Sequence, residues 1–139
     1  MSIATNTMPP PEARNRAARW FGTLGAKLGF LGVAAGAFGA HALKQRLVPA
    51  MLEVYETAAR YQLVHAMALV LVALCLERRA LKSWRVAGWL FVVGIVLFSG
   101  SLYALSLLGQ PMWGAVTPIG GLCLLTGWAC LAAGWWWGR

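Results

Sequence analysis

Acidic residues are scarce in this chain. Only four of the 139 residues are Asp or Glu, and charged residues of either sign make up 12% of the total. Residues 86–138 contain no Asp, Glu, Lys or Arg, an uncharged run of 53 residues. Such a composition, with 60% hydrophobic residues, excludes an ordinary soluble domain. It leaves room for about four membrane spans of about 20 residues each.

Patterns typical of catalysis are also missing. The sequence offers no nucleophile with a base, no carboxylate pair and no phosphate-binding loop. The cysteines Cys75, Cys123 and Cys130 lie in apolar stretches without paired spacing, so they are interpreted as small hydrophobic residues, not disulfides or metal ligands. We therefore expect no enzymatic activity, no cofactor and no metal.

Basic residues, by contrast, are in excess. The formal net charge is +8, which in a soluble protein would suggest binding to nucleic acid. Here the twelve Lys and Arg residues stand in tails and junctions, where they set orientation and meet anionic lipid head groups. The expected partner is the lipid bilayer and not nucleic acid.

Glycine recurs along the first apolar segment in steps of three and four, which keeps these residues on one helical stripe. Helices in lipid associate through close packing, because lipid provides no hydrophobic drive between them. The stripe predicts that the bundle is organised around this helix. The glycines predicted to pack against other helices are Gly25, Gly29, Gly32, Gly36 and Gly39.

Four transmembrane helices are predicted, at about residues 21–43, 57–76, 86–108 and 114–137. The second has an extension from Pro49, which either projects from the membrane or lies along its surface. A turn at Gly109-Gln110-Pro111 separates the last two helices. Residues 1–20 are predicted to be a disordered basic tail, preceding a domain of residues 21–139. The fold class is all-α, a compact four-helix membrane bundle.

The first apolar segment has a second interpretation, as a secretory signal peptide. It follows a basic tail and ends in Ala40-His41-Ala42, a sequence of the A-x-A cleavage type. The glycine-rich core and the length of the apolar run favour a retained helix instead.

The distribution of positive charge predicts the orientation. Nine Lys or Arg residues lie in the tail with Lys27, the 77–85 junction and Arg139, against three in the 44–60 connection and none in the 109–113 turn. Since positive residues concentrate on the cytoplasmic side, both termini are expected there.

Polar side chains inside the predicted spans gather in the half of the membrane away from the termini. On the second helix Tyr61, Gln62 and His65 share a face, and on the third Ser99 and Tyr103 do the same. An ionisable group within a span indicates a site, so these residues are predicted to line a pocket open to the outer side. His41 lies at the rim of the first helix. The simpler interpretation is interhelical hydrogen bonding, worth about 0.6–2 kcal/mol for each bond.

Four motifs occur in order along the chain: GAFGAHAL (36–43), YQLVHAMAL (61–69), LFSGSLY (97–103), and TPIGG (117–121) followed by GW (127–128). Together they resemble the YgdD/YwdK-type family of small bacterial inner-membrane proteins. The resemblance covers about residues 25–135. It implies a four-helix, multi-pass protein of the bacterial inner membrane and adds weight to His41, His65, Ser99, Tyr103 and Pro118. It implies no activity and no cofactor.

These observations favour a structural or accessory membrane component, partnered by other membrane-protein subunits or by further copies of itself. One alternative is a binder of a quinone or lipid in an outer-leaflet pocket between the second and third helices. Another is a proton-coupled exporter, for which only His65 offers a suitable group. Bis-histidine haem is disfavoured, because His41 and His65 are offset in depth by about 10 Å.

Overall fold

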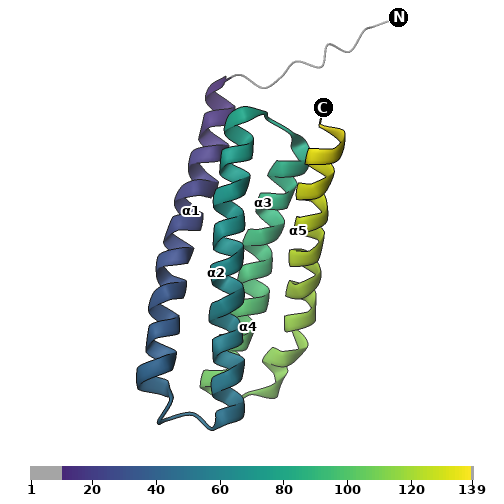
Figure 1. The fold of residues 1–139 in the computed structure, drawn as a ribbon. Coiled ribbons are helices and arrows are strands. Elements are labelled where there is room, and N and C mark those ends of the chain that lie inside the picture. Colours follow the sequence, from purple (N-terminus) through teal and green to yellow (C-terminus); the bar gives the residue numbers. More distant parts are fainter. Residues whose placement is uncertain (1–10, 139) are drawn as a thin grey trace, which may run out of the picture.

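The structure is a computed structural model that describes residues 11–138, and every regular element within that range is a helix (Figure 1). In chain order the elements are α1 (Pro11–Phe38), the π-helical turn η1 (Gly39–Leu43), α2 (Pro49–Arg78), α3 (Lys82–Gly94), the π-helical turn η2 (Ile95–Ser99), α4 (Gly100–Leu108), the 3₁₀ turn η3 (Pro111–Ala115) and α5 (Thr117–Trp137). Four helical segments in these residues are long and apolar enough to cross a membrane: Arg16–Leu43, Pro49–Arg78, Lys82–Leu108 and Pro111–Trp137. The predicted all-helical fold with four spans is confirmed.

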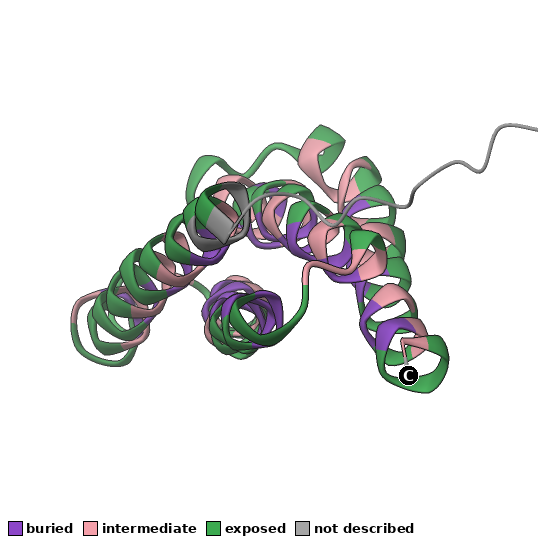
Figure 2. Ribbon diagram, turned by 90° about the horizontal axis from the view of Figure 1, so that it is seen from above, coloured by how far each residue is buried: buried purple, intermediate pink, exposed green. Residues whose placement is uncertain are grey.

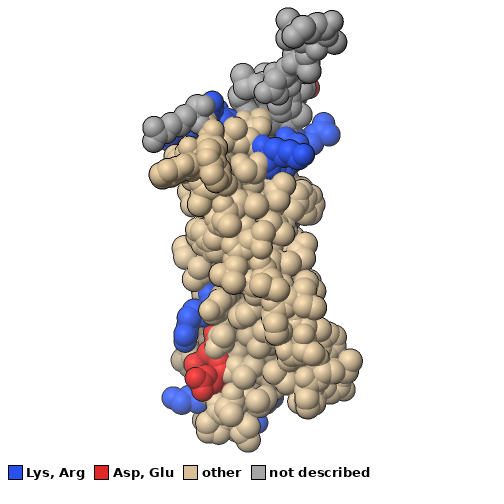
Figure 3. Space-filling view, turned by 90° about the vertical axis from the view of Figure 1, so that its right-hand side faces the viewer, with Lys and Arg blue, Asp and Glu red and all other residues tan. Residues whose placement is uncertain are grey.

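Most charged side chains lie at the two ends of the bundle, and Lys27, midway along the first helical segment, is an exception. On the face drawn in Figure 3, the long middle section carries none, and most of the visible acidic surface lies near the lower end. A bilayer places its hydrocarbon core against such an uncharged band and its head groups against the charged ends.

Helix α2 is the central element. Seen from above, it stands in front of an arc formed by α1, α3–α4 and α5, and the buried residues lie where the arc faces it (Figure 2). Leu69 and Val72 of α2 are fully buried, as is Phe91 of α3. Because lipid is as apolar as these side chains, the core is held by close contact and by hydrogen bonds between helices.

Helix α1 begins at Pro11, ten residues earlier than predicted. The prediction of a disordered tail is wrong for residues 11–20, while residues 1–10 lie outside the described part. Proline suits the first turn of a helix, and Glu12 complements its dipole. Ala18 and Phe21 are 1% and 2% exposed, so packing stabilises a segment that has no apolar stripe of its own.

The glycine stripe of α1 faces α2, and the fit is uneven. A Cβ added at Gly25 would lie 2.8 Å from the carbonyl oxygen of Ala66, and one at Gly32 would lie 2.9 Å from Leu63. Gly39 meets the ring of Tyr55 at 2.9 Å, whereas Gly29 has only an ordinary contact. A Cβ added at Gly36 would meet no atom of another described element within 4 Å, so the space beside this glycine is open.

A second glycine column lies on α5, where Gly120, Gly127 and Gly134 repeat every seventh residue and are all buried. A Cβ at Gly120 would meet the backbone of Phe98, one at Gly127 would lie 2.7 Å from the ring of Phe91, and one at Gly134 would meet the Trp84 indole. These approaches are as close as any on α1. The bundle therefore has two glycine seams, not the single one expected on the first helix.

The connections are short. Gly109 ends α4 with a φ of 66°, the left-handed conformation that glycine adopts without steric cost. Helix α2 runs unbroken from Pro49, and its early residues Tyr55 and Ala58 are buried in the bundle. The extension before residue 57 thus continues the helix along its neighbours. The third predicted helix begins at Lys82, earlier than expected, and contains η2 at mid-length.

Candidate functional site

The predicted polar residues of the spans fall into two groups on different sides of α2. Gln62, Tyr103 and Ser99 face a groove between α1 and α4, and Tyr55 joins them there. His65 lies toward α5 instead, and Tyr61 packs against Phe98 of η2. At 100° per residue Tyr61 and Gln62 point in directions 100° apart, and α2 has neighbours on both sides.

Gln62 is the hub of the first group. Its Nε2 donates to the carbonyl oxygen of Leu28 on α1 at 2.8 Å, and its Oε1 accepts from the Tyr103 hydroxyl on α4 at 2.9 Å. The side chain is 6% exposed. One amide therefore ties three helices together inside the span.

Tyr55 extends this network toward the far end of α1. Its hydroxyl donates to the carbonyl oxygen of Ala35 at 3.2 Å, and its ring lies edge-on to Tyr103 with centroids 5.0 Å apart. The sequence analysis did not select Tyr55 as a site residue. Its place four residues before Ala59 and seven before Gln62, on the same helical face, is the signal that could have found it.

The groove beside these residues, called here the α1–α4 groove, has a volume of about 470 Å³. Leu28 and Leu31 form one wall, and Val96 and Leu107 form the other. Tyr55, Gln62, Ser99 and Tyr103 contribute its polar surface. This size falls within the range of sites for small molecules, and the lining is mainly apolar, as in such sites.

Ser99 differs from the other polar residues of the groove. It is 1% exposed, and within residues 11–138 its buried hydroxyl oxygen has no hydrogen-bond partner. It closes the π-helical turn η2, a geometry that is often found at functional sites. By comparison, Ser101 bonds to Phe98 and Thr117, and Ser106 bonds to the Tyr103 carbonyl. Among the described residues, the Ser99 hydroxyl thus has no acceptor.

His65 occupies the second group with both ring nitrogens engaged. Nδ1 lies 2.7 Å from the carbonyl oxygen of Tyr61, and Nε2 lies 3.1 Å from Nε1 of Trp128 on α5. A carbonyl oxygen only accepts and an indole N–H only donates, so Nδ1 carries the proton and Nε2 accepts. His65 is therefore a neutral imidazole of the Nδ1–H tautomer.

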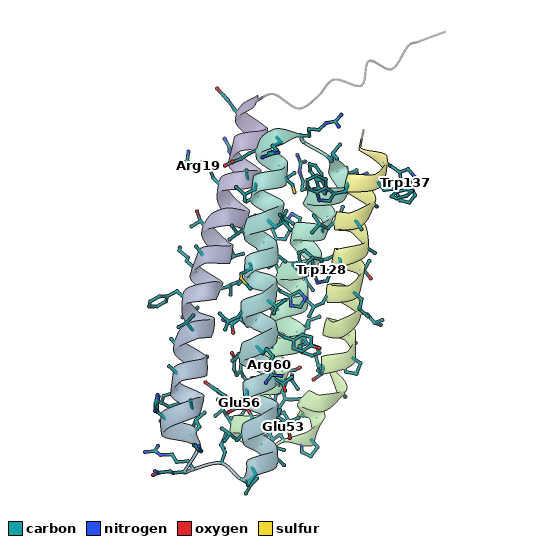
Figure 4. All side chains as sticks on the ribbon, viewed as in Figure 1. Arg19, Glu53, Glu56, Arg60, Trp128 and Trp137 are labelled. Atoms are coloured by element: carbon teal, nitrogen blue, oxygen red, sulfur yellow. The ribbon has the colours of Figure 1, made fainter. Side chains whose placement is uncertain are left out.

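Aromatic rings enclose this histidine. Phe91 and Trp128 have ring centroids 5.7 and 6.1 Å from it, and Tyr61 stacks on it at 5.9 Å. Figure 4 shows Trp128 directed from α5 toward α2. Trp128 was absent from the predicted site, although the sequence analysis noted the GW pair at 127–128. The indole of Trp128 links α5 to α2.

His41 lies apart from both groups. It is exposed in η1, at the end of the first span, 24 positions before His65 along the chain. The two histidines were already a poor match for a bis-histidine haem site. Since both nitrogens of His65 are used within the protein, His65 has none left for iron.

A family model described as "Protein of unknown function (DUF423)" matches residues 35–121 of the chain. That range contains Tyr55, Gln62, His65, Ser99 and Tyr103, whereas Trp128 lies beyond it.

Curated relatives cover more of the chain. YwdK of Bacillus subtilis, a UPF0382 membrane protein, is 42% identical over 106 residues, 76% of this chain and 86% of the relative. A UPF0382 membrane protein of Staphylococcus haemolyticus is 41% identical over 109 residues, 78% of this chain and 88% of the relative. YgdD of Escherichia coli, a UPF0382 inner membrane protein, is 40% identical over 107 residues, 76% of this chain and 81% of the relative.

No solved structure matches the chain. The names of the relatives agree with the four spanning helices, so the prediction of a multi-pass inner-membrane protein is confirmed. The family resemblance seen in the sequence motifs is confirmed as well: the chain belongs to the DUF423 family, and its curated relatives are called UPF0382 membrane proteins.

Proposed function

We propose that the protein is a structural or accessory component of the inner membrane that has no turnover of its own. The observation that carries the proposal is the use of polar groups inside the span. Hydrogen bonds to neighbouring helices of the same chain are formed by the side chains of Gln62, Tyr103 and His65. Bonds of this kind fix the packing of a small bundle and leave few groups free for chemistry.

The proton-coupled alternative receives less support from the same geometry. A second proton on His65 would occupy Nε2 and remove the acceptor that Trp128 uses. A carrier also needs an ionisable group whose access alternates between the two sides of the membrane, and the ring of His65 is 4% exposed among aromatic side chains.

We also propose an orientation for the protein in the membrane, in which both termini lie in the cytoplasm. The excess of Lys and Arg at the end of the bundle that holds the termini supports it. A reporter fused after Arg139 should be active only on the cytoplasmic side. Activity outside the membrane would contradict this part of the proposal.

The accessory role is tested by the mass of the assembly that the chain forms. The protein is extracted directly into lipid nanodiscs at its natural expression level, and its particle mass is compared with the 15.0 kDa of one chain. We expect a particle that contains further protein, either other subunits or further copies. A single chain per particle under several extraction conditions would contradict the role.

A second candidate function is the binding of a small lipophilic molecule, a quinone or a lipid, in the α1–α4 groove. The free Ser99 hydroxyl favours it, because a buried donor without a partner is costly unless an acceptor reaches it. The carbonyl oxygen of a quinone or of a lipid ester is such an acceptor, and the apolar walls suit the chain attached to it.

Mass analysis of molecules released from the purified protein tests this second function. Ser99→Ala removes the free donor, and Gly100→Leu places a side chain at a lining position with no neighbour of its own within 4 Å. Ser106→Ala is the matched control, since the Ser106 hydroxyl already bonds to Tyr103 within its own helix. Equal amounts of released molecule from all three variants and the wild type would exclude a groove ligand.

A further inference from the structure

A larger hollow lies at the other end of the first span, between the start of α1 and the start of α3. Its volume is about 540 Å³. Helix α1 contributes Glu12, Arg16 and Trp20 to its lining, and α3 contributes Arg85 and Trp89, with Phe21 at its base. We call it the arginine–tryptophan pocket. None of these residues belongs to the groups around Gln62 and His65.

The aromatic side of this pocket is held in place by packing. Phe21 is 2% exposed and seats against Gly88, where an added Cβ would lie 2.7 Å from its ring. Trp89 meets Phe21 edge-on at 5.8 Å between centroids and lies 4.8 Å from Trp20. The pocket is therefore formed before any ligand enters, which lowers the entropic cost of binding.

On the charged side of the pocket, one arginine N–H donor is unsatisfied by the described residues. The Nε of Arg85 is buried and has no hydrogen-bond partner among the residues that the structure describes, although a guanidinium presents five N–H donors. Arg16 approaches from α1, across the pocket. The one acid of the lining, Glu12, stands one turn from Arg16 and balances only one of the two arginines.

Further positive charge surrounds the opening. A hollow on the α1 side shares Arg16 and Trp20 with the pocket and adds Arg19 and Lys27. A hollow on the α3 side shares Arg85 and Trp89 and adds Lys82. The combined surface is positive and aromatic, at the end of the bundle where Arg19 and Trp137 also lie (Figure 4). Tryptophan beside basic residues marks the level of the lipid head groups.

We propose that the arginine–tryptophan pocket binds the phosphate head group of an anionic phospholipid. Arg16 and Arg85 face the phosphate from two helices, because guanidinium groups bind phosphate oxygens through paired N–H donors. Trp20 and Trp89 contact the glycerol region, where amphipathic rings sit in a bilayer. A free phosphate ion offers the same oxygens but no glycerol and no chains for the two indoles to contact.

Native mass spectrometry of the full-length protein in detergent tests the proposal. Dioleoyl phosphatidylglycerol, dioleoyl phosphatidylcholine and inorganic phosphate are added separately at equal concentration. We expect a retained phosphatidylglycerol adduct on the wild type, at least about fivefold more than the phosphatidylcholine adduct. Equal retention of the two lipids would overturn the proposal. Displacement of phosphatidylglycerol by an equal concentration of inorganic phosphate would do so too, because it would assign the site to the free ion.

Variants locate the adduct. Arg85→Gln and Arg16→Gln should each lower phosphatidylglycerol retention about fivefold, since each removes one of the two positive charges that face the phosphate. Arg16 is exposed, so its variant keeps the fold even if Arg85→Gln does not. Glu12→Gln should raise retention, an effect that a purely structural role would not produce. Arg60→Gln, exposed on α2 at the other end of the bundle, is the control; a loss there equal to that of Arg16→Gln would overturn the assignment.

Discussion

The indole N–H of Trp128 on α5 donates to Nε2 of His65 on α2, across 3.1 Å in the interior of the bundle. This bond fixes the tautomer of the histidine and makes it an element of packing. It also joins two helices whose backbones lie too far apart for close contact.

Replacing Trp128 by phenylalanine should therefore weaken the bundle. A smaller aromatic ring remains, but Nε2 of His65 loses its donor, and we expect the free energy of unfolding in detergent to fall by about 1 kcal/mol. The measurement is repeated in a His65→Leu background, where no acceptor remains. In that background, the tryptophan substitution should no longer lower the free energy of unfolding through the loss of this hydrogen bond. An equal loss in both backgrounds would show that the bond contributes nothing.

The tautomer of His65 can be observed directly. Solid-state NMR of protein labelled with ¹⁵N at histidine should show a protonated Nδ1 and an unprotonated Nε2 for the buried residue. His41, exposed in η1, supplies a second imidazole in the same sample for comparison. A proton on Nε2 of the buried histidine would contradict the bonding pattern around it.

Gln62→Leu should destabilise the bundle by about 1–3 kcal/mol, because it removes two interhelical bonds and leaves the hydroxyl of the half-buried Tyr103 without its acceptor. Adding Tyr103→Phe should recover part of this loss, since no unpaired hydroxyl then remains. Unfolding by a denaturing detergent measures both. Gln110→Leu, in the exposed turn before η3, is the control and should have little effect.

Two glycines of the α1 stripe should respond differently to the same change. Gly32→Leu forces a side chain into Leu63 of α2 and should cost about 1–3 kcal/mol or prevent assembly. The Cβ of Gly36→Leu would meet no described atom within 4 Å, and this variant should leave the yield of folded protein unchanged. From the sequence alone both were predicted to disrupt the bundle. A loss of fold in Gly36→Leu would contradict the open space beside it.

Neighbouring glycines on α5 offer a still closer comparison. Gly120→Ala would place its methyl group 2.8 Å from the carbonyl carbon of Leu97, a backbone atom that cannot turn aside, and should reduce thermal stability clearly. Gly121→Ala would lie 3.7 Å from the ring of Phe98 and should be neutral or stabilising, because alanine favours helix. Equal melting temperatures for the two variants would argue against the α5 seam.

The sequence predicted the four spans well, because uncharged length is what a bilayer requires of a helix. The sequence did not predict the helix at residues 11–20, because that segment has no apolar stripe. There Phe21 and Ala18 are buried by contacts with other helices, and tertiary packing of this kind overrides local composition. The α5 glycines were visible at a spacing of seven, but the sequence does not state which helix they face.

The sequence predicted most residues of the candidate site, but it did not predict how they are arranged. Gln62, Tyr103 and Ser99 do share a groove, yet His65 contacts Trp128 of α5 and Tyr61 packs against Phe98 of η2. Periodicity gives the angle between side chains on one helix, whereas the partner at each angle depends on how the helices pack. Trp128 illustrates this limit, since its role requires knowing that this face of α5 turns toward α2.

The hydrogen bonds of Gln62 and His65 have a consequence for the assembly of the bundle. Apolar contact between helices tolerates sliding and rotation, since one row of methyl groups packs much like the next. Gln62 and His65 stand three residues apart on α2, about 4.5 Å in height, and reach different helices. Together, these two hydrogen bonds fix the rotation of α2 about its own axis and its depth in the membrane.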